Sequence, residues 1–190
     1  PHLRAGAEHF PQGVVQDAAA AAATLQDLVA EMERRDRAGR QLPRLVVAID
    51  ELADLLQTGG KPVAEALTRL TQRGREAGLH VVAATQRPAA ALVGGLVKAN
   101  CPIRLVGSVT SAEDAKVASG LPGTEAERLL GRGDFLLVAK GNIIRFQAAF
   151  ADSAELDAIT ARIGAGGRRR RTWAAPQAAP AGRRLSAPAQ

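Results

Sequence analysis

The stretch that decides the fold is Leu45-Val46-Val47-Ala48-Ile49-Asp50-Glu51, in which five apolar residues lead directly into two carboxylates. A continuous apolar run of this length is typical of a strand buried on both faces of a parallel sheet. A second such run follows at 80–85, and residues 62–77 between the two runs place their apolar side chains at helical spacing. Strands that alternate with helices predict an α/β fold, with a mostly parallel sheet flanked by helices.

Outward from this stretch, the chain divides into further helices and strands. Apolar spacing and turn residues predict helices over 16–37, 111–118, 124–130 and 152–163, and strands over 103–109, 135–139 and 143–150. In the helix over 124–130, Thr124 is expected to be the N-cap and Glu127 to complete a capping box. Gly59-Gly60 is expected to break the chain just before Pro62, a residue that suits the first turn of a helix.

The net charge of +6 comes from the end of the chain and not from its body. Seven of the 25 basic residues lie from Arg162 onward, where no acid occurs, and this leaves 18 basic and 19 acidic residues in 1–161. Residues 164–190 are rich in Gly, Ala, Pro and Arg and have too little apolar content to fold alone. We therefore expect one nearly neutral folded domain over 1–163 and a disordered basic tail over 164–190.

Several classes of protein are excluded by the composition. The single cysteine, Cys101, cannot form an internal disulfide framework or a multi-thiolate metal site, and its apolar neighbours favour a small buried side chain. His2, His9 and His80 lack the spacing of metal ligands. The chain has no apolar run long enough to cross a membrane, and its start, Pro1-His2-Leu3-Arg4, has no signal-peptide pattern. We expect it to be a piece of something longer.

Asp50 and Glu51 are the first candidates for chemistry. A strand of an α/β sheet delivers such residues to its carboxyl end, where these sheets bind ligands. In P-loop nucleotide hydrolases the first acid holds the magnesium shell, and the second can orient the attacking water. The alternative is a buried strand followed by a solvated loop, since short apolar runs that end in two acids are common.

Thr85-Gln86-Arg87-Pro88, after the next strand, gives the second candidate. A neutral polar side chain beside an acid pair can sense the γ-phosphate of a nucleotide, whereas the alternative is an ordinary turn. Together the two motifs favour a nucleotide hydrolase. The phosphate-binding sequence G-x-x-x-x-G-K-[ST] is nowhere in the chain, because Pro62 follows Gly60-Lys61 where a hydroxyl residue is needed. We therefore expect a fold without its phosphate-binding half, inactive by itself.

Six motifs in order resemble the motor of the FtsK/SpoIIIE double-stranded DNA translocases. They are Glu31-Met32-Glu33-Arg34-Arg35, Asp50-Glu51-Leu52-Ala53-Asp54-Leu55, Thr85-Gln86-Arg87-Pro88, Lys98-Ala99-Asn100, Pro102-x-Arg104 and Leu129-Leu130-Gly131-x-Gly133-Asp134. Pro1-His2-Leu3 is similar to the segment just downstream of the family's phosphate-binding half. The resemblance covers roughly residues 1–160, and it implies a RecA-like P-loop NTPase fold of which 1–163 would be the C-terminal part of the motor domain.

The resemblance implies an ATP-driven hexameric ring that pumps duplex DNA through its pore, with ATP and Mg²⁺ as cofactors and a place in chromosome segregation and cell division. Asp50 would be the magnesium-side acid, Glu51 the base that orients water, and Gln86 the sensor of the γ-phosphate.

Arg75, in the stretch Gln72-Arg73-Gly74-Arg75, would by the same resemblance reach the neighbouring subunit's ATP as an arginine finger. Such a finger offsets the charge that develops on the transferred phosphoryl group. The alternative is a solvated helix face, on which Glu65 and Arg69 would pair at i, i+4.

The same resemblance implies that Thr85, Arg87, Lys98 and Lys116 face the pore and bind DNA. A motor that grips any sequence needs phosphate contacts and not base contacts, and the alternative for each residue is simple surface charge. Where the family tends to have Ser-Ser-Lys and Asp-Ser-Arg, this chain has Thr110-Ser111-Ala112 and Asp114-Ala115-Lys116. One basic side chain is thereby lost, and one Arg is replaced by Lys, which keeps the charge but cannot form two parallel hydrogen bonds to a phosphate. We therefore expect DNA binding that is weaker or that uses other residues.

Two other functions stay open on the sequence. One is a protein-secretion or conjugation ATPase of the same fold, and the other is a non-catalytic, ring-forming or DNA-binding remnant. The intact Asp50, Glu51 and Gln86 argue against a remnant. We expect a cytoplasmic location, with a membrane-anchored parent protein as an alternative, and the tail would at most add a non-specific hold on DNA.

Overall fold

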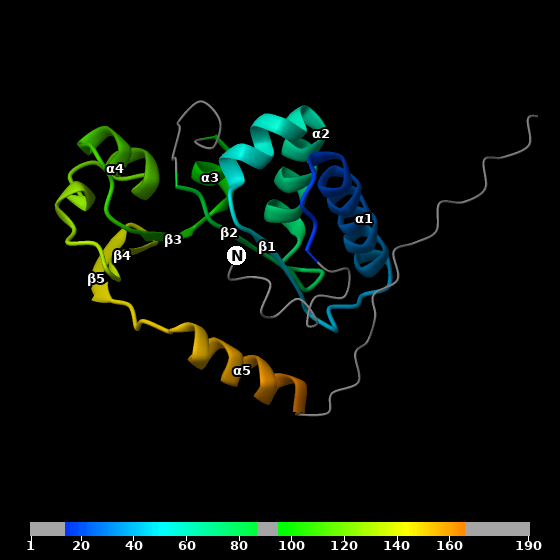
Figure 1. The fold of residues 1–190 in the computed structure, drawn as a ribbon. Coiled ribbons are helices and arrows are strands. Elements are labelled where there is room, and N and C mark those ends of the chain that lie inside the picture. The colour runs from blue at the N-terminus through cyan, green and yellow to red at the C-terminus, as the bar shows by residue number, and fades with distance from the viewer. Residues whose placement is uncertain (1–13, 87–94, 166–190) are drawn as a thin grey trace, which may run out of the picture.

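The computed structural model of the chain describes residues 14–86 and 95–165 (Figure 1). Its elements in order are α1 (Ala18–Arg37), β1 (Leu45–Ile49), α2 (Leu52–Arg73), β2 (Leu79–Ala83), α3 (Gly95–Asn100), β3 (Ile103–Val106), α4 (Ala112–Ser119), the 3-10 helix η3 (Ala126–Arg128), β4 (Asp134–Ala139), β5 (Asn142–Gln147) and α5 (Ser153–Ala165). The expected tail lies outside the described residues from 166 onward, as does the N-terminal stretch 1–13. In the part of the chain that the structure describes, no helix is long and apolar enough to span a membrane.

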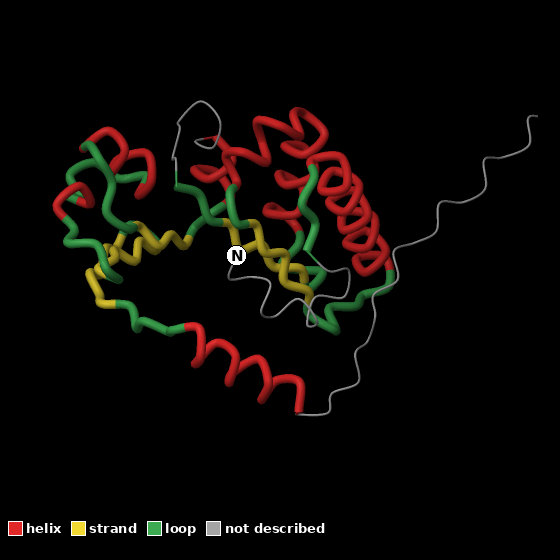
Figure 2. Tube along the Cα trace, in the orientation of Figure 1, coloured by secondary structure: helices red, strands yellow, loops and turns green. Residues whose placement is uncertain are grey.

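The two apolar runs form a parallel pair, as predicted. β1 and β2 pair from Leu45 opposite Leu79 to Ile49 opposite Ala83. The helices α1 and α2 pack side by side against one face of this pair (Figures 1 and 2). The side chains that are most deeply buried between these layers are Met32, Val63, Leu67, Leu70 and Leu79.

The expectation that these strands are buried on both faces is wrong within the described residues. Leu45, Val47 and Ile49 face the helices, whereas the alternate side chains point away from them. Val46 and Val82 are 67% and 61% exposed. The physical reason is that α1 and α2 supply a single helical layer, so the period-two alternation of the strands leaves the other apolar face uncovered.

The break at Gly59-Gly60 is present as a kink inside one long helix. Gly60 has φ 59° and ψ −150°, a backbone conformation that favours glycine, and Pro62 follows in the first turn of the second segment. The segment before the kink, which begins directly after Glu51, is helical and was not predicted. This early start matters because it makes Glu51 the N-cap of α2.

The second half of the chain forms a separate, antiparallel sheet in the order β3–β4–β5. The strands expected over 135–139 and 143–150 form a hairpin, in which Ala139 lies opposite Asn142 and Lys140-Gly141 makes the turn. β3 also pairs with β4 in the antiparallel sense, so parallel pairing in the described residues is confined to β1 and β2. A second core covers one face of this sheet; its members are Val106, Ala115, Ala126, Leu129, Leu136 and Val138.

The helix expected over 124–130 and its capping box are wrong. Only Ala126–Arg128 is helical, as a 3-10 turn, and the residue before it, Glu125, has a left-handed backbone with no side-chain cap. Thr124 Oγ1 and Glu127 Oε2 are buried without a hydrogen-bond partner among the described residues. The tight packing of Ala126 and Leu129 into the second core leaves room for a single turn.

Candidate active site

The structure brings the two predicted motifs together at the carboxyl ends of β1 and β2. Beyond the strands, the Ala84 amide donates to the Ile49 carbonyl at 2.8 Å, and the Leu52 amide donates to the Ala84 carbonyl at 2.8 Å. These bonds continue the parallel pairing past the last strand residues. They fix Asp50-Glu51 directly beside Thr85-Gln86, as the carboxyl-end rule predicts for α/β sheets.

Glu51 is held in one orientation by the neighbouring motif. The Thr85 hydroxyl donates to Glu51 Oε1, and the Gln86 backbone amide donates to Oε2 at 2.9 Å. The Ala53 amide donates to Oε1 at 3.3 Å, which makes Glu51 the side-chain cap of α2. Both carboxylate oxygens are therefore fixed by groups from two elements, and the side chain remains partly exposed at this edge of the sheet.

Asp50 and Gln86 are exposed at the same edge, next to the fixed carboxylate. In the described residues no group of three His, Cys, Asp or Glu could hold a metal ion by itself. A magnesium ion that enters with a nucleotide keeps several waters and takes one or two protein carboxylates together with phosphate oxygens. A single free carboxylate at the end of a strand fits that coordination, so Asp50 suits Mg²⁺ bound with a nucleotide.

Arg75 lies at the opposite end of the same parallel pair. It belongs to the turn over 74–78 that leads into β2, whereas Glu51 lies where the strands end. Residues 79–85 span about 20 Å at roughly 3.3 Å per extended residue. Arg75 is therefore too far away to reach a ligand bound beside the Glu51 of its own chain.

The alternative for Arg75 was a solvated helix face on which Glu65 and Arg69 pair, and that pair does not form. Glu65 pairs with Lys61 at 3.6 Å, and Arg69 pairs with Glu33 of α1 instead of Glu65. Among the described residues Arg75 has neither an ion pair nor a side-chain hydrogen bond, and it is exposed. Its exposure fits both a solvated surface and contact with another molecule, and the role of Arg75 stays a prediction.

The DNA-binding candidates are less completely placed. Lys116 is exposed on α4, which packs on the second sheet and not on the parallel pair. Arg87 and the side chain of Lys98 lie outside the described residues. The structure gives the Thr85 hydroxyl a partner in Glu51, and the DNA role of all four residues stays a prediction.

The segment in which this chain departs from the family pattern forms the start of α4. The hydroxyls of Thr110 and Ser111 donate to Asp114 Oδ2 at 2.7 and 2.9 Å, and the Asp114 amide donates back to Ser111 Oγ at 3.1 Å. These hydrogen bonds hold the pKa of Asp114 below its usual value. The local role of these side chains is therefore to cap the helix.

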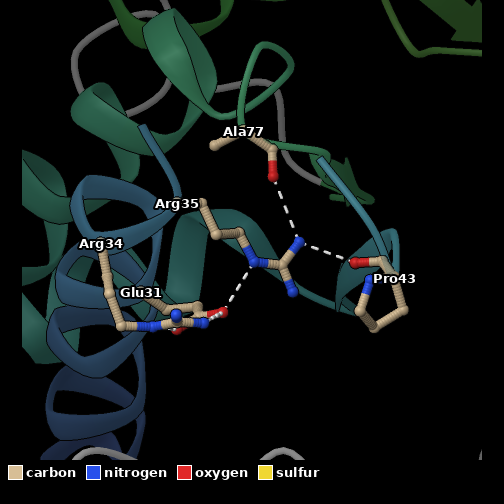
Figure 3. A network of polar contacts seen from close by, with 5 residues as sticks. All are labelled: Glu31, Arg34, Arg35, Pro43 and Ala77. Atoms are coloured by element: carbon tan, nitrogen blue, oxygen red, sulfur yellow. Dashed lines mark hydrogen bonds and ion pairs between the residues drawn. The ribbon is translucent and has the colours of Figure 1, made fainter. Parts of the chain in front are cut away.

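Sequence reasoning missed a buried ion-pair network at the end of α1 (Figure 3). Glu31 Oε1 accepts from Arg35 Nε at 2.7 Å, and Arg34 donates to both oxygens of the same carboxylate at 2.7 Å. The two arginines hold the pKa of Glu31 below its usual value, chiefly through the hydrogen bonds of Arg34. The i, i+3 and i, i+4 spacing of one acid and two arginines could have indicated these pairs.

A second ion pair ties the hairpin to the preceding turn. Arg145 donates to Asp134 through two bonds at 2.9 and 2.7 Å, and the Leu130 amide donates to the same carboxylate at 2.8 Å. These donors, Arg145 first, lower the pKa of Asp134 to about 2. Asp134 belongs to the last of the resembling motifs, and its role here is structural.

Comparison with known proteins identifies the family. A family model described as FtsK/SpoIIIE matches residues 36–90, a range that contains β1, α2, β2 and both candidate motifs. The DNA translocase SftA of Bacillus subtilis is 38% identical over 178 residues, 82% of this chain. The DNA translocase FtsK of Campylobacter jejuni is 40% identical over 173 residues, 80% of this chain. The chain belongs to the FtsK/SpoIIIE family. The match spans 18% of each of these FtsK/SpoIIIE relatives.

Solved structures agree with the fold of this FtsK/SpoIIIE member. The pCW3 conjugation coupling protein TcpA, in its monomer form with ATPγS, gives a TM-score of 0.69 at 23% identity, over 80% of this chain and 51% of that chain. The cytoplasmic domain of the type VII secretion ATPase EccC from Thermomonospora curvata gives 0.66 at 24% identity, over 80% and 21%. The expected α/β fold of the P-loop ATPase type is thereby confirmed.

Proposed function

We propose that this chain forms the hydrolysis side of the ATP site in a DNA translocase motor. The observation that carries the proposal is the fixed Glu51 carboxylate, held by Thr85 and the Gln86 amide at the carboxyl end of a parallel pair. Membership of a family whose relatives are named DNA translocases supports double-stranded DNA as the substrate.

Each residue at this edge would have a distinct task. Asp50, exposed beside the site, would take one position in the shell of Mg²⁺, which neutralises phosphate charge when bound with ATP. Glu51 would orient the attacking water through its carboxylate, which the neighbouring donors hold in place. Gln86, with an exposed amide side chain, would bind the γ-phosphate. The phosphate cradle would come from a segment outside 1–190, because no G-x-x-x-x-G-K-[ST] occurs here.

Arg75 would act on the ATP of an adjacent subunit in a ring, which we propose to be hexameric. Its position at the far end of the strands, about 20 Å from the Glu51 edge, supports action between subunits and not within one. A donated guanidinium stabilises the charge of the phosphoryl transition state. In such a ring Thr85, Arg87, Lys98 and Lys116 would contact DNA phosphates, and the motor would work in the cytoplasm in chromosome segregation.

The direct test uses an ATP-competent protein in which residues 1–190 are joined to an upstream phosphate-binding half. Glu51→Gln should retain ATP binding and abolish hydrolysis, because the amide keeps the shape but cannot accept the proton of water. The matched control is Glu113→Gln, an exposed acid on α4 that should leave turnover unchanged. Undiminished hydrolysis in Glu51→Gln would refute the assignment.

Mixing experiments test the role of Arg75. Arg75→Ala subunits combined with Glu51→Gln subunits should recover part of the lost activity, since some interfaces then pair an intact Glu51 with an intact Arg75. Glu51→Gln alone should be inactive, and Arg75→Ala alone should keep only a small residual rate. If no mixing ratio restores hydrolysis, Arg75 does not act between subunits.

A second candidate, a conjugation or secretion ATPase of the same fold, is favoured by the likeness to TcpA and EccC. The two candidates differ in the ligand that stimulates turnover. Addition of duplex DNA to the ATP-competent protein should raise its hydrolysis rate if the cargo is DNA. A rate that is indifferent to DNA of any length would favour a protein cargo.

A further inference from the structure

The network around Arg35 lies at the same end of the strands as Arg75. Arg35 Nη1 donates to the carbonyl of Ala77 at 3.1 Å and to the carbonyl of Pro43 at 2.7 Å (Figure 3). Ala77 is in the turn that leads into β2, and Pro43 is just before β1. One guanidinium thus joins the end of α1 to the chain segments that enter both strands.

The guanidinium is buried, and its counter-charge is buried with it. The side chains of Arg35 and Glu31 are each 3% exposed, and the Arg35 Nε–Glu31 Oε1 bond is 2.7 Å. A buried charge without a partner is costly, so Glu31 fixes the fork of Arg35 in the one orientation in which the same guanidinium reaches both carbonyls. Arg34 binds the outer side of the same carboxylate and does not touch the turn.

The backbone of the turn that Arg35 binds is also restrained by hydrogen bonds within the turn and by close packing. The amides of Ala77 and Leu79 both donate to the Gly74 carbonyl, at 3.0 and 2.7 Å, and the Gly78 amide donates to Arg75 itself at 3.1 Å. Gly78 has φ 75° and lies so close to residue 41 that an added Cβ would be 2.0 Å from the Gln41 carbonyl oxygen. The backbone of Arg75 is therefore set by a turn that the buried Arg35 joins to α1.

We propose that Arg35 is the positioning residue for Arg75: by gripping the Ala77 carbonyl from the core, it fixes the direction in which Arg75 leaves the subunit. This inference rests on the proposed action of Arg75 on a neighbour's ATP. It assigns a task to a buried pair that would otherwise be only structural. Arg35 touches no nucleotide, so it acts on hydrolysis through the turn alone.

The first test needs only the 190-residue chain. In Arg35→Met, which keeps the aliphatic stem but removes all three hydrogen bonds of the guanidinium, trypsin should cleave after Arg75 at least about tenfold faster, because the turn opens more often. Cleavage after Arg132, in the distant second half, is the internal reference and should not change. The matched control Arg34→Met loses two hydrogen bonds to the same Glu31 but none to the turn, and its cleavage after Arg75 should match the wild type. Equal cleavage after Arg75 in wild type and Arg35→Met would overturn the proposal.

The second test uses the ATP-competent protein and separates positioning from general damage. Arg35→Met should lower kcat about tenfold or more while the KM for ATP stays within about twofold, because the nucleotide sits at the other end of the sheet. Mixing Arg35→Met subunits with Glu51→Gln subunits should restore hydrolysis, as mixing Arg75→Ala subunits with Glu51→Gln subunits does. Arg35→Met combined with Arg75→Ala should be no slower than Arg75→Ala alone. The proposal would be overturned if the losses in kcat from Arg35→Met and Arg75→Ala multiply in the double variant. A raised KM in Arg35→Met without a change in kcat would also overturn it.

The same measurements distinguish the two levels of inference. If Arg75→Ala hydrolyses ATP at the normal rate, the proposed finger is refuted and its positioning falls with it. If Arg75→Ala is strongly impaired and rescued by mixing while Arg35→Met is fully active, the finger stands and the positioning is refuted. Should Arg35→Met fail to fold, Arg35→Lys replaces it, since one ammonium cannot bind Glu31 and both carbonyls in the fork geometry of arginine. Its kcat should fall by a smaller factor, and a normal kcat would overturn the proposal.

Discussion

Replacement of Glu31 by glutamine is the sharpest test of the buried network. The substitution keeps the shape and one acceptor oxygen but leaves the Arg35 guanidinium, 3% exposed, without its counter-charge. Breaking a buried ion pair from one side costs about 3–5 kcal/mol. Because the carbonyls of Pro43 and Ala77 still accept from Arg35, we expect a loss of about 3 kcal/mol in the free energy of unfolding, at the lower end of that range.

The assay is urea denaturation followed by far-ultraviolet circular dichroism. Glu33→Gln, two residues along the same helix, is the matched control: Glu33 and Arg69 are 36% and 49% exposed, and such surface pairs contribute below about 1 kcal/mol. A loss in Glu31→Gln no larger than in Glu33→Gln would refute the reasoning, since it would mean that the buried pair contributes no more than an exposed one.

The pH dependence of the same variant gives a second check. The pKa of Glu31 is lowered in the folded protein, so its stabilising effect is present above the unfolded value of 4.5 and is lost as the pH falls through the folded value. The stability difference between wild type and Glu31→Gln should therefore shrink as the pH falls from about 6 toward about 3. A difference that stays constant over this range would show that the charge of Glu31 is not what stabilises the fold.

Three further results are expected. Thr85→Val, which removes one hydroxyl donor to Glu51, should lower the kcat of the ATP-competent protein about tenfold with the KM for ATP unchanged, and an unaltered kcat would contradict the orienting role of that hydroxyl. In Asp134→Asn, the free energy of unfolding should depend less on pH between the unfolded pKa of 3.8 and the folded value of about 2, because Arg145 stabilises the ionised carboxylate in the wild type. Urea midpoints across that pH range measure this dependence. The same dependence in wild type and Asp134→Asn would contradict the prediction. Burial raises the pKa of the Cys101 thiol, so iodoacetamide should label it more slowly at neutral pH than a free thiol, and labelling at the free-thiol rate would show that it is accessible.

Residues close together in the sequence were predicted well where local chemistry dominates. The two apolar runs became β1 and β2, and Gly60 with Pro62 marks a kink because few other residues tolerate that backbone. The pairing of Asp50-Glu51 with Thr85-Gln86 also followed from the sequence, since the carboxyl ends of adjacent parallel strands meet at one edge.

Predictions failed where a local pattern competed with packing. Thr124 and Glu127 have the spacing of a capping box, yet Ala126 and Leu129 are drawn into the second core and allow only one 3-10 turn. Likewise Arg69 is four residues from Glu65 but pairs with Glu33 of the neighbouring helix α1, while Glu65 pairs with Lys61. In both cases a contact with a distant element outweighed a local side-chain interaction, which contributes only a few tenths of a kcal/mol to stability.

By itself, the sequence determined the α/β class, the acid pair at a strand end and the family resemblance, because each depends on residue types within a few positions. Tertiary structure alone decided how Glu51 is oriented, that one sheet face stays open, and that Arg35 grips the carbonyl of Ala77, 42 residues away in the chain. Every residue has a backbone carbonyl, so the sequence does not indicate which carbonyl accepts a hydrogen bond from a buried guanidinium. Only the packing of α1 against the turn before β2 shows that Arg35 binds the carbonyl of Ala77.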